Sequence, residues 1–539
     1  METRTNRKKR FKFNRVLSLI TLLTGIYLVY NILLLDNLDK MLVYLIAGGI
    51  LLFDLIFIIC GFKFKNKVLC IFFAFILIIT MGANIYAGYN VGKIYGFFNG
   101  LNKETITKSS SLVALKKNNI NSIDEVKNKT IGITNDTTSV DGYILAEELI
   151  KENSLRDNNK IKEYNGYSAI LKALYSNEID LAFLPTNYAA MFSSTDGYEK
   201  IEDETNIIIS KKTENSKEGT RLAASDKKVT EPFTMLLMGI DSTKDGLNNS
   251  DSFNGDSLVV ITFNPKTLNA TMLSIPRDTY VPIMCFQGQY KNKITHSAWN
   301  GAQCVIDTIE NFLDVKIDYY MKINFTGLVD LVNAVDGVEV DVPYSFCEQD
   351  SKRRFGKNMI YVKKGLQTLN GEQALALSRN RKTHADMCTR EWTQGQRDDF
   401  VRGTNQQLVI KGLIEKAKKI NSLTKINNIL DAITKNLDTN MSRDTILSFY
   451  DVLKDIMANS DETSEAVTIQ SLTIDGTGEM IYDEHVKLTL WDFVPHDASV
   501  EQVKEAIKIN LGKSEYSMDK DFDFSITREY QLKIPGKLS

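Results

Sequence analysis

The 539-residue sequence predicts a mixed α/β protein that is held in a membrane by three helices. Three apolar stretches near the N-terminus are each long enough to cross a bilayer as a helix. Beyond them, apolar runs of strand length are interspersed with amphipathic helical patterns. The two kinds of pattern mix without the regular strand–helix alternation of βαβ units. The net charge of -2 gives no overall preference for nucleic acid or acidic surfaces.

The membrane region spans residues 16–95 and contains apolar stretches at 16–35, 41–62 and 68–89. Residues 1–15 form a tail with seven basic residues and one acid, and the connector at 63–67 is also basic, unlike that at 36–40. By the positive-inside rule, the tail is cytoplasmic and everything after about residue 95 is extracellular. This predicts a multi-pass protein of the cell membrane.

Two alternatives for the N-terminus are weaker. A cleavable signal peptide does not fit the first stretch, because its apolar run is too long and no small-residue cleavage site follows it. A nucleic-acid-binding tail would explain the basic residues, but their position beside a span is better explained by topology and anionic lipid headgroups. We therefore expect no nucleic-acid partner. Asp54, inside the second stretch, is interpreted as a protonated or helix-paired structural residue, with a functional relay as the alternative.

The exported part is divided by its composition into four segments. An accessory α/β domain is expected at 96–212, a polar linker at 213–230, a larger domain at 231–512 and an extension at 513–539. Residues 169–183 of the accessory domain resemble one lobe of periplasmic solute-binding proteins, and nothing in them suggests chemistry. The linker is rich in Lys, Glu and Ser, which predicts exposure.

The exported part also holds four of the six cysteines, Cys285, Cys304, Cys347 and Cys388. An oxidising exterior permits disulfides, and four cysteines allow three pairings. We expect Cys285 to pair with Cys304 and Cys347 with Cys388, each pair closing one loop, with free thiols as the alternative. No Cys-x-x-Cys pair occurs and the four histidines are scattered, which argues against a zinc site.

Charged residues of the larger domain collect where predicted strands and helices end. Strands are expected at 233–240, 256–263, 270–275, 338–342 and 466–474, and helices at 305–313, 370–377, 399–420 and 500–511. Asp241 follows the first strand, Asp256 opens the second and Arg277 follows the third. Arg379 and Arg381 come after a helix. A single helical stripe carries Asp399, Arg402 and Gln406, at spacings i, i+3 and i+7.

These residue types suit a pyrophosphate with a divalent cation. Guanidinium groups match phosphate oxygens in bidentate geometry, and carboxylates bind hard cations such as Mg²⁺. Phosphoryl transfer needs mainly positioning and charge neutralisation, which such a set supplies. The alternative is a surface ion-pair network of the same groups, and spacing alone does not decide between the two.

The motifs of the larger domain, in their order along the chain, closely resemble those of the LytR-CpsA-Psr family. The matching motifs are Gly239-Ile240-Asp241, Gly255-Asp256, Ser274-Ile275-Pro276-Arg277-Asp278, Lys293-Ile294, Leu369-Asn370-Gly371-Glu372-Gln373-Ala374-Leu375, Arg379-Asn380-Arg381, Asp399-Phe400-Val401-Arg402 and Gln406-Gln407. Three spans and an accessory domain resemble the capsule-type branch. The resemblance implies an α/β/α sandwich around a mixed central sheet, with a hydrophobic tunnel for a polyprenyl chain.

The resemblance also implies a function and a role for each matching residue. An anionic glycopolymer, teichoic acid or capsular polysaccharide, would pass from a polyprenyl pyrophosphate carrier to peptidoglycan, with polyprenyl phosphate leaving. Asp241 and Asp256 would hold Mg²⁺, and Asp399 would be the base. The phosphate contacts would come from Arg277, Arg379, Arg381, Arg402, Gln406 and Lys293.

The chain departs from the common family pattern at several positions. Asn254 and Asn405 stand where the family often has arginine, Thr295 where it often has asparagine, and Asp336-Gly337 where it often has two glycines. The two lost arginines motivate the alternative of a non-catalytic polyprenyl-phosphate-binding sensor or regulator of the cell wall. The identity of the glycan and of the acceptor hydroxyl, any ligand of the accessory domain and the oligomeric state, a homo-oligomer being one option, are left open.

Overall fold

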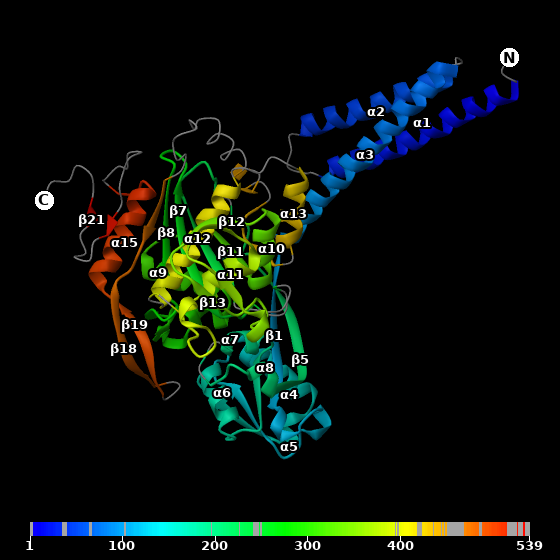
Figure 1. The fold of residues 1–539 in the computed structure, drawn as a ribbon. Coiled ribbons are helices and arrows are strands. Elements are labelled where there is room, and N and C mark those ends of the chain that lie inside the picture. Colours follow the sequence, from blue (N-terminus) through cyan, green and yellow to red (C-terminus); the bar gives the residue numbers. More distant parts are fainter. Residues whose placement is uncertain are drawn as a thin grey trace. The chain divides into compact units, whose positions relative to one another are not determined.

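The computed structural model of the chain is drawn in Figure 1. It describes residues 4–34, 40–63, 67–101, 104–193, 195, 197–225, 227–240, 247, 251–393, 395, 398–417, 423–434, 436–442, 445–446, 448–449, 468–484, 488–514, 525–526 and 532–533. The chain divides into two compact units. One comprises Met1–Leu101 with Ser422–Thr434, and the other comprises Asn102–Asn421 with Lys435–Ser539.

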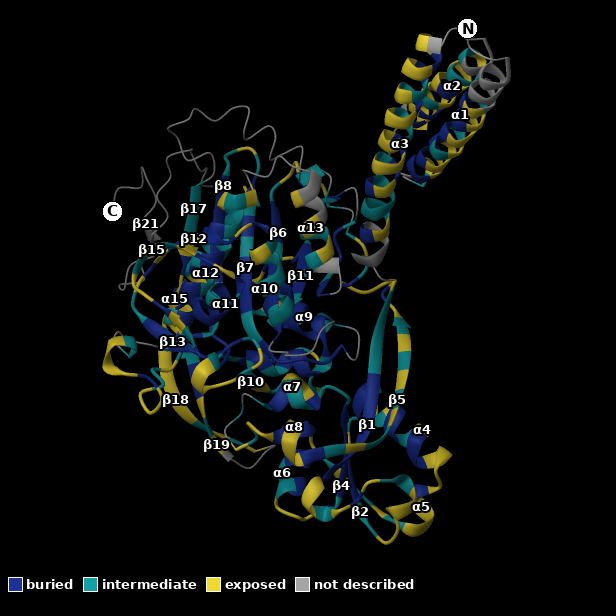
Figure 2. Ribbon diagram, turned by 45° about the vertical axis from the view of Figure 1, so that its right-hand side comes forward, coloured by how far each residue is buried: buried dark blue, intermediate teal, exposed yellow. Residues whose placement is uncertain are grey.

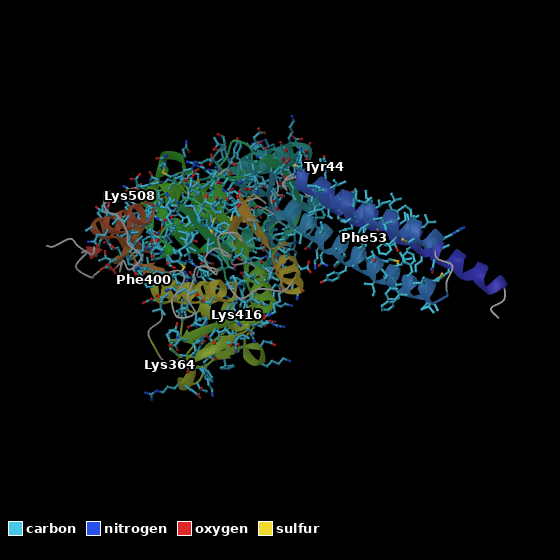
Figure 3. All side chains as sticks on the ribbon, turned by 90° about the horizontal axis from the view of Figure 1, so that it is seen from above. Tyr44, Phe53, Lys364, Phe400, Lys416 and Lys508 are labelled. Atoms are coloured by element: carbon cyan, nitrogen blue, oxygen red, sulfur yellow. A yellow bond between two sulfur atoms is a disulfide. The ribbon has the colours of Figure 1, made fainter. Side chains whose placement is uncertain are left out.

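The first unit contains three helices that are long and apolar enough to cross a membrane, as predicted. They are α1 (Arg4–Leu33), α2 (Lys40–Lys63) and α3 (Lys67–Leu101), with apolar segments Phe13–Leu33, Val43–Cys60 and Val68–Phe97. Large side chains on their outer faces are exposed, such as Tyr44 at 64% and Phe53 at 51% (Figure 3). Apolar surface of this kind is expected to face lipid.

Asp54 of α2 is buried among the three helices, with an exposed fraction of 1%. It fits against Gly25 of α1, where an added Cβ would come within 1.7 Å of a carboxylate oxygen. This placement supports the structural interpretation of Asp54. The short helix α13 (Leu423–Thr434) also belongs to this unit and is joined to α3 by an ion pair between Asp431 and Lys93.

The accessory domain of the second unit is a five-stranded sheet with helices on both faces. Its strand order is β3-β2-β4-β1-β5, with β2 parallel to β3 and β4, and β1 antiparallel to β4 and β5. The strands are β1 (Thr105–Leu115), β2 (Thr130–Thr134), β3 (Lys160–Tyr164), β4 (Leu181–Pro185) and β5 (Thr205–Ser216). The helices are α4 (Leu145–Glu152), α5 (Leu155–Asn158), α6 (Tyr167–Tyr175), α7 (Tyr188–Phe192) and α8 (Ile201–Glu204).

Two boundaries of this domain differ from the expected ones. Helix α3 continues to Leu101 instead of ending near residue 95. Strand β5 continues to Ser216, inside the segment expected to be an exposed linker from residue 213, because it pairs with the whole length of β1. Lys217, the next residue, is only 3% exposed and forms an ion pair of 2.8 Å with Asp438. The polar composition of this segment therefore reflects buried ion pairing as well as exposure.

The larger domain is built on a mixed six-stranded sheet. The order is β16-β11-β6-β7-β8-β17, in which β11 is parallel to β6, β17 is parallel to β8, and the other pairs are antiparallel. Its strands are β6 (Phe233–Ile240), β7 (Gly255–Asn264), β8 (Asn269–Ile275), β11 (Tyr319–Asn324), β16 (Leu437–Thr439) and β17 (Thr468–Leu472). Strand β11, which pairs with β6 and with the edge strand β16, was not predicted.

Helices cover both faces of this sheet, giving the α/β/α sandwich (Figure 1). On one face lie α9 (Ala302–Leu313) and α15 (Asp497–Asn510), and on the other α10 (Phe325–Ala334), α11 (Gly371–Arg379) and α12 (Asp399–Ala417). Smaller strands are β9 (Tyr280–Pro282), β10 (Lys291–Lys293), β12 (Val338–Val342), β13 (Phe346–Glu348), β14 (Ile360–Val362), β15 (Gly365–Leu369), β20 (Ser525–Ile526) and β21 (Leu532–Lys533). A hairpin of β18 (Gly476–Asp483) and β19 (Leu488–Pro495) follows β17. Disulfides join Cys285 to Cys304 and Cys347 to Cys388, the expected pairings.

Along β6, buried residues alternate with half-buried ones, and Figure 2 shows the strands of the central sheet coloured by burial. Side chains alternate between the faces of a strand, and in β6 the buried residues Leu236, Met238 and Ile240 join the core formed with α9 and α15. The alternate residues Leu237 and Gly239 are only half-buried. They face the side of α10, α11 and α12, where the helices leave a cavity.

A buried chain of alternating charges joins the accessory domain to the larger domain. Lys108 of β1 lies 3.5 Å from Asp141 and 3.2 Å from Asp251. Lys322 of β11 lies 3.4 Å from Asp251 and 3.5 Å from Asp438, which Lys217 also contacts. Burial alone would raise the pKa of Asp251, but Lys108 and Lys322 outweigh it and lower the pKa to about 2. This chain therefore fixes one domain on the other.

Replacing Lys108 by methionine should destabilise the second unit. It leaves the Asp141 and Asp251 carboxylates facing each other in a buried site, and removing one partner of a buried ion pair costs about 3–5 kcal/mol. The free energy of unfolding of the detergent-solubilised chain, measured by chemical denaturation, should fall by this amount above pH 4.

The matched control is Lys211→Met, on the neighbouring strand β5, where the ion pairs with Glu148 and Glu152 are exposed. This variant should unfold like the wild type. Because the pKa of Asp251 is lowered on folding, its contribution is present above its unfolded pKa near 4 and is lost as the pH falls toward 2. The difference between Lys108→Met and wild type should shrink over that range, and equal stability at pH 7 would show that the pair contributes nothing.

Candidate active site

The cavity beside the half-filled sheet face has a volume of about 1360 Å³ and lies between β6, β7 and β11 on one side and α10, α11 and α12 on the other. Its walls are mainly apolar and include Leu237, Val259, Met321, Ile323, Leu328, Leu331, Leu375, Val409, Ile410 and Leu413. Gly239 leaves no room for a side chain here, because an added Cβ would come within 2.8 Å of the Ser257 Cβ. The cavity is thus an apolar pocket between layers of the sandwich.

Six of the predicted site residues line this same cavity. They are Asp256, Arg277, Arg379, Arg381, Arg402 and Gln406. Asp256 opens β7, Arg277 follows β8, Arg379 ends α11, and Arg402 and Gln406 share one stripe of α12. Asn370 caps α11 through a 3.0 Å hydrogen bond from the Gln373 amide, as predicted. Residues from four separate segments therefore converge, as the ordered motifs implied.

Four guanidinium groups at one cavity make the site electropositive. Arg277 forms an ion pair with Asp256, and Arg402 lies 3.3 Å from Asp399. Burial lowers the pKa of Arg402; Asp399 and Asp256 oppose this, while the charges of Arg277 and Arg381 add to it. Cations that repel one another in a buried place favour an anionic ligand.

Arg379 is held differently. Its guanidinium lies 4.5 Å from the centre of the Phe325 ring and donates a 3.2 Å hydrogen bond to the carbonyl oxygen of Asp350. Gln406 donates a 3.2 Å hydrogen bond to the carbonyl oxygen of Ser378, next to Arg379 in the chain. The C-terminal end of α11 is thus tied to the body of α12 at the polar part of the cavity.

Asp278 is a site residue to which the motif analysis gave no role. Its carboxylate accepts a 2.6 Å hydrogen bond from Lys293 and also contacts Arg277 and Asp399. Burial would raise the pKa of Asp278, but Lys293 and Arg277 outweigh it and lower the pKa. Its position directly after Arg277 was the available signal. Asp278 connects Asp399, the predicted base, and Lys293 to the arginine cluster. Asp399 and Lys293 themselves do not line the large cavity.

Of the two aspartates expected to hold a metal, the structure describes only one. Asp256 lines the cavity, while Asp241 lies outside the described residues. Ile240 pairs with Gly255, so the residues that precede the two aspartates are partners across adjacent strands. Within the described part of the chain, no group of three His, Cys, Asp or Glu side chains forms a metal site. A carboxylate beside an arginine cluster nevertheless suits a hard cation that completes its shell with oxygens of a bound anion and of water.

The structure gives the departures from the family pattern a local explanation. Asn254 donates a 3.1 Å hydrogen bond to Asp256 and accepts one of 2.9 Å from Thr295. These two replacements therefore form a matched pair that orients Asp256. Asn405 is fully buried and donates a 2.8 Å hydrogen bond to the Tyr344 hydroxyl. Neither asparagine adds a charge to the site.

Comparisons with known proteins identify the two domains. A model of the LytR_cpsA_psr family matches residues 192–509, and one of the periplasmic substrate-binding protein of phosphonate ABC transporters matches residues 99–260. The second match agrees with the resemblance seen in the accessory domain.

Among curated relatives, the polyisoprenyl-teichoic acid–peptidoglycan teichoic acid transferase TagU of Bacillus licheniformis is 37% identical over 264 residues, covering 49% of this chain and 75% of the relative. TagU of Bacillus anthracis is 33% identical over 299 residues, covering 55% and 83%. The crystal structure of Bacillus subtilis TagV covers 53% of this chain and 99% of its own, with 30% identity and a TM-score of 0.42. The LytR_cpsA_psr family model matches residues 192–509, which are more than half of this chain, and the chain therefore belongs to the LytR-CpsA-Psr family.

Proposed function

We propose that the larger domain transfers an anionic glycopolymer, teichoic acid or capsular polysaccharide, from a polyprenyl pyrophosphate carrier to peptidoglycan. The observation that carries the proposal is the junction of an apolar cavity of about 1360 Å³ with four arginines. An apolar cavity takes a hydrocarbon chain, and clustered guanidinium groups take phosphate. A lipid pyrophosphate joins both in one molecule. The names of the TagU relatives describe transfer of the same kind.

Each residue has a defined task in this reaction. Arg277, Arg381 and Arg402 bind the phosphate oxygens, and Arg379, fixed against Phe325, adds a further donor. Asp256, together with Asp241, is proposed to hold Mg²⁺, which would neutralise charge on the phosphates. Asp399, held between Arg402 and Asp278, accepts the proton of the acceptor hydroxyl. The polyprenyl phosphate leaves on the side of the apolar cavity.

The purified full chain in detergent should release polyprenyl phosphate from a carrier-linked glycan when peptidoglycan and Mg²⁺ are present, and chelation should stop the release. Replacing both Arg379 and Arg381 by alanine should lower turnover more than about 100-fold, because each charged phosphate contact contributes about 1.5–3 kcal/mol. Chromatography of the released lipid measures this.

Arg354→Ala is the matched control. Arg354 pairs with Asp350 but does not line the cavity, so this variant should keep wild-type turnover. Full turnover of the Arg379, Arg381 double variant would overturn the proposal. Tight polyprenyl phosphate binding with no turnover on any wall acceptor would favour the sensor alternative, which the two asparagines at usual arginine positions motivate.

We also propose that the N-terminus is cytoplasmic and that both exported domains work outside the cell, since the two disulfides suit an oxidising exterior. In intact cells, a membrane-impermeant maleimide should label Asn37→Cys in the first connector and leave Asn66→Cys in the second unlabelled. After the membranes are permeabilised, the maleimide should label both variants, which shows that each cysteine is reactive when the reagent can reach it. The reverse labelling pattern would contradict this orientation.

A further inference from the structure

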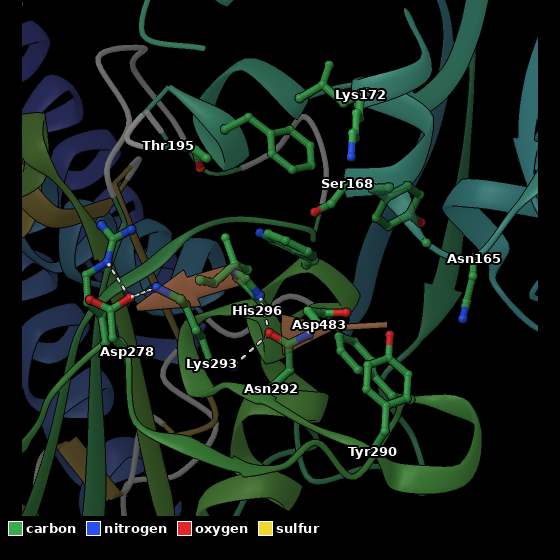
Figure 4. A pocket seen from close by; sticks show the side chains of 18 of the residues that line it. Asn165, Ser168, Lys172, Thr195, Asp278, Tyr290, Asn292, Lys293, His296 and Asp483 are labelled. Carbon is green, nitrogen blue, oxygen red and sulfur yellow. Dashed lines mark hydrogen bonds and ion pairs between the residues drawn. The ribbon is translucent and has the colours of Figure 1, made fainter. Parts of the chain in front are cut away.

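A second cavity, of about 630 Å³, lies between the accessory domain and the larger domain (Figure 4). It shares Arg277, Arg381 and Lys382 with the apolar cavity, so the two meet at the arginine cluster. None of the site residues transferred from the family motifs comes from the accessory-domain wall. Because Arg277 and Arg381 line both cavities, a group in the second cavity lies next to any anion that these arginines bind.

The wall from the larger domain is rich in aromatic side chains. Trp299 stacks on His296 with ring centres 3.8 Å apart, and Tyr290 lies beside them in the lining. Trp491 reaches the cavity from the β18–β19 hairpin and is 44% exposed, so part of its ring is open to a ligand. Trp299 is buried between His296 and Phe192, so the aromatic faces open to a ligand are those of Trp491 and Tyr290, and such faces pack against the C–H faces of sugar rings.

The wall from the accessory domain supplies polar groups. The parallel strands β2 and β3 end here, at Thr134 and just before Asn165, and ligands of α/β sheets bind at such carboxyl ends. Helix α6 presents Ser168 and Lys172, four residues apart and therefore on one face. Figure 4 shows both side chains pointing into the cavity.

The lining has more cationic than acidic residues, which suits a sugar that is attached to an anionic pyrophosphate. The cationic residues are Lys172, Arg277, Lys293, Arg381 and Lys382, and the acidic ones are Asp136, Asp278 and Asp483. Asp278 is already paired with Lys293 and Arg277, and Asp483 accepts a 3.0 Å hydrogen bond from Asn292. His296 adds no charge at neutral pH, because burial and the nearby cations lower its pKa well below its usual value.

We propose that the second cavity binds the sugar attached to the pyrophosphate of the donor, and that the accessory domain, through Lys172 and Ser168, helps to select that sugar. The inference rests on the proposed function and names the part of the donor that the accessory domain recognises. The donor is favoured over the acceptor because the shared arginines hold the phosphate to which only the donor sugar is covalently attached. The buried charge chain through Lys108 and Asp251 holds both walls in place.

Two ligands test the proposal by calorimetry on the full chain in detergent. One is bare polyprenyl pyrophosphate, and the other is the same lipid carrying one N-acetylhexosamine on its terminal phosphate. Lys172→Glu and Trp491→Ala should each weaken binding of the sugar-bearing lipid about tenfold, the change expected from one lost charged or stacking contact. Binding of the bare lipid should change less than twofold.

Lys151→Glu is the matched control, since Lys151 is exposed at the end of α4 and does not line the cavity. It should bind both lipids like the wild type, and thermal unfolding should show that all variants are folded. Unchanged binding of the sugar-bearing lipid by both variants, with bare lipid still bound, would overturn this inference and leave the proposed function intact. An effect on the KM for peptidoglycan alone would assign the cavity to the acceptor and would also overturn it. Failure of the wild type to bind either lipid would instead reject the proposed function.

Discussion

The ion pairs of the buried Asp251 carboxylate are the interaction on which the arrangement of the second unit depends. Asp251 lies five residues before Asp256 and is held by Lys108 from the accessory sheet and Lys322 from the central sheet. A buried charge is costly unless it is paired. The chain from Asp141 to Lys217 meets this condition with three lysines and three aspartates. Separating the domains would break it, so the accessory domain is fixed in place.

Docking of the accessory domain is reinforced by apolar contacts. Trp299 of the larger domain packs into the hydrophobic core of the accessory domain and lies 5.2 Å from the ring of Phe192. Trp299 is therefore a residue of the larger domain whose side chain completes the hydrophobic core of the accessory domain. Its other neighbour is His296, which lines the second cavity. The same residues that join the domains thus also shape the space between them.

Much of the fold and of the arginine cluster could be predicted, because their signals are local. The strands at 233–240, 256–263 and 270–275 are apolar runs, and Asp256 and Arg277 stand at their ends. Strand β11 was missed because Lys322 interrupts its pattern, and its partners Asp251 and Asp438 are distant in the sequence. Lys217 was assigned to an exposed linker because its partner, Asp438, is also distant in the sequence. The accessory wall of the second cavity could not be predicted, since it exists only once two domains meet.

The order of the two cavities also constrains the direction of the proposed reaction. If the polyprenyl chain lies in the apolar cavity, the leaving phosphate faces the apolar side of the arginine cluster, and in-line displacement requires the acceptor hydroxyl to approach from the opposite side. Asp399 and Asp278 lie behind Arg402 and Arg277 and outside the lining of the apolar cavity. Asp278 also lines the second cavity, so a base formed by Asp399 beside Asp278 would act on the side where the donor sugar is proposed to lie. The accessory domain forms the other wall of that cavity and would then shape the space through which the acceptor hydroxyl approaches.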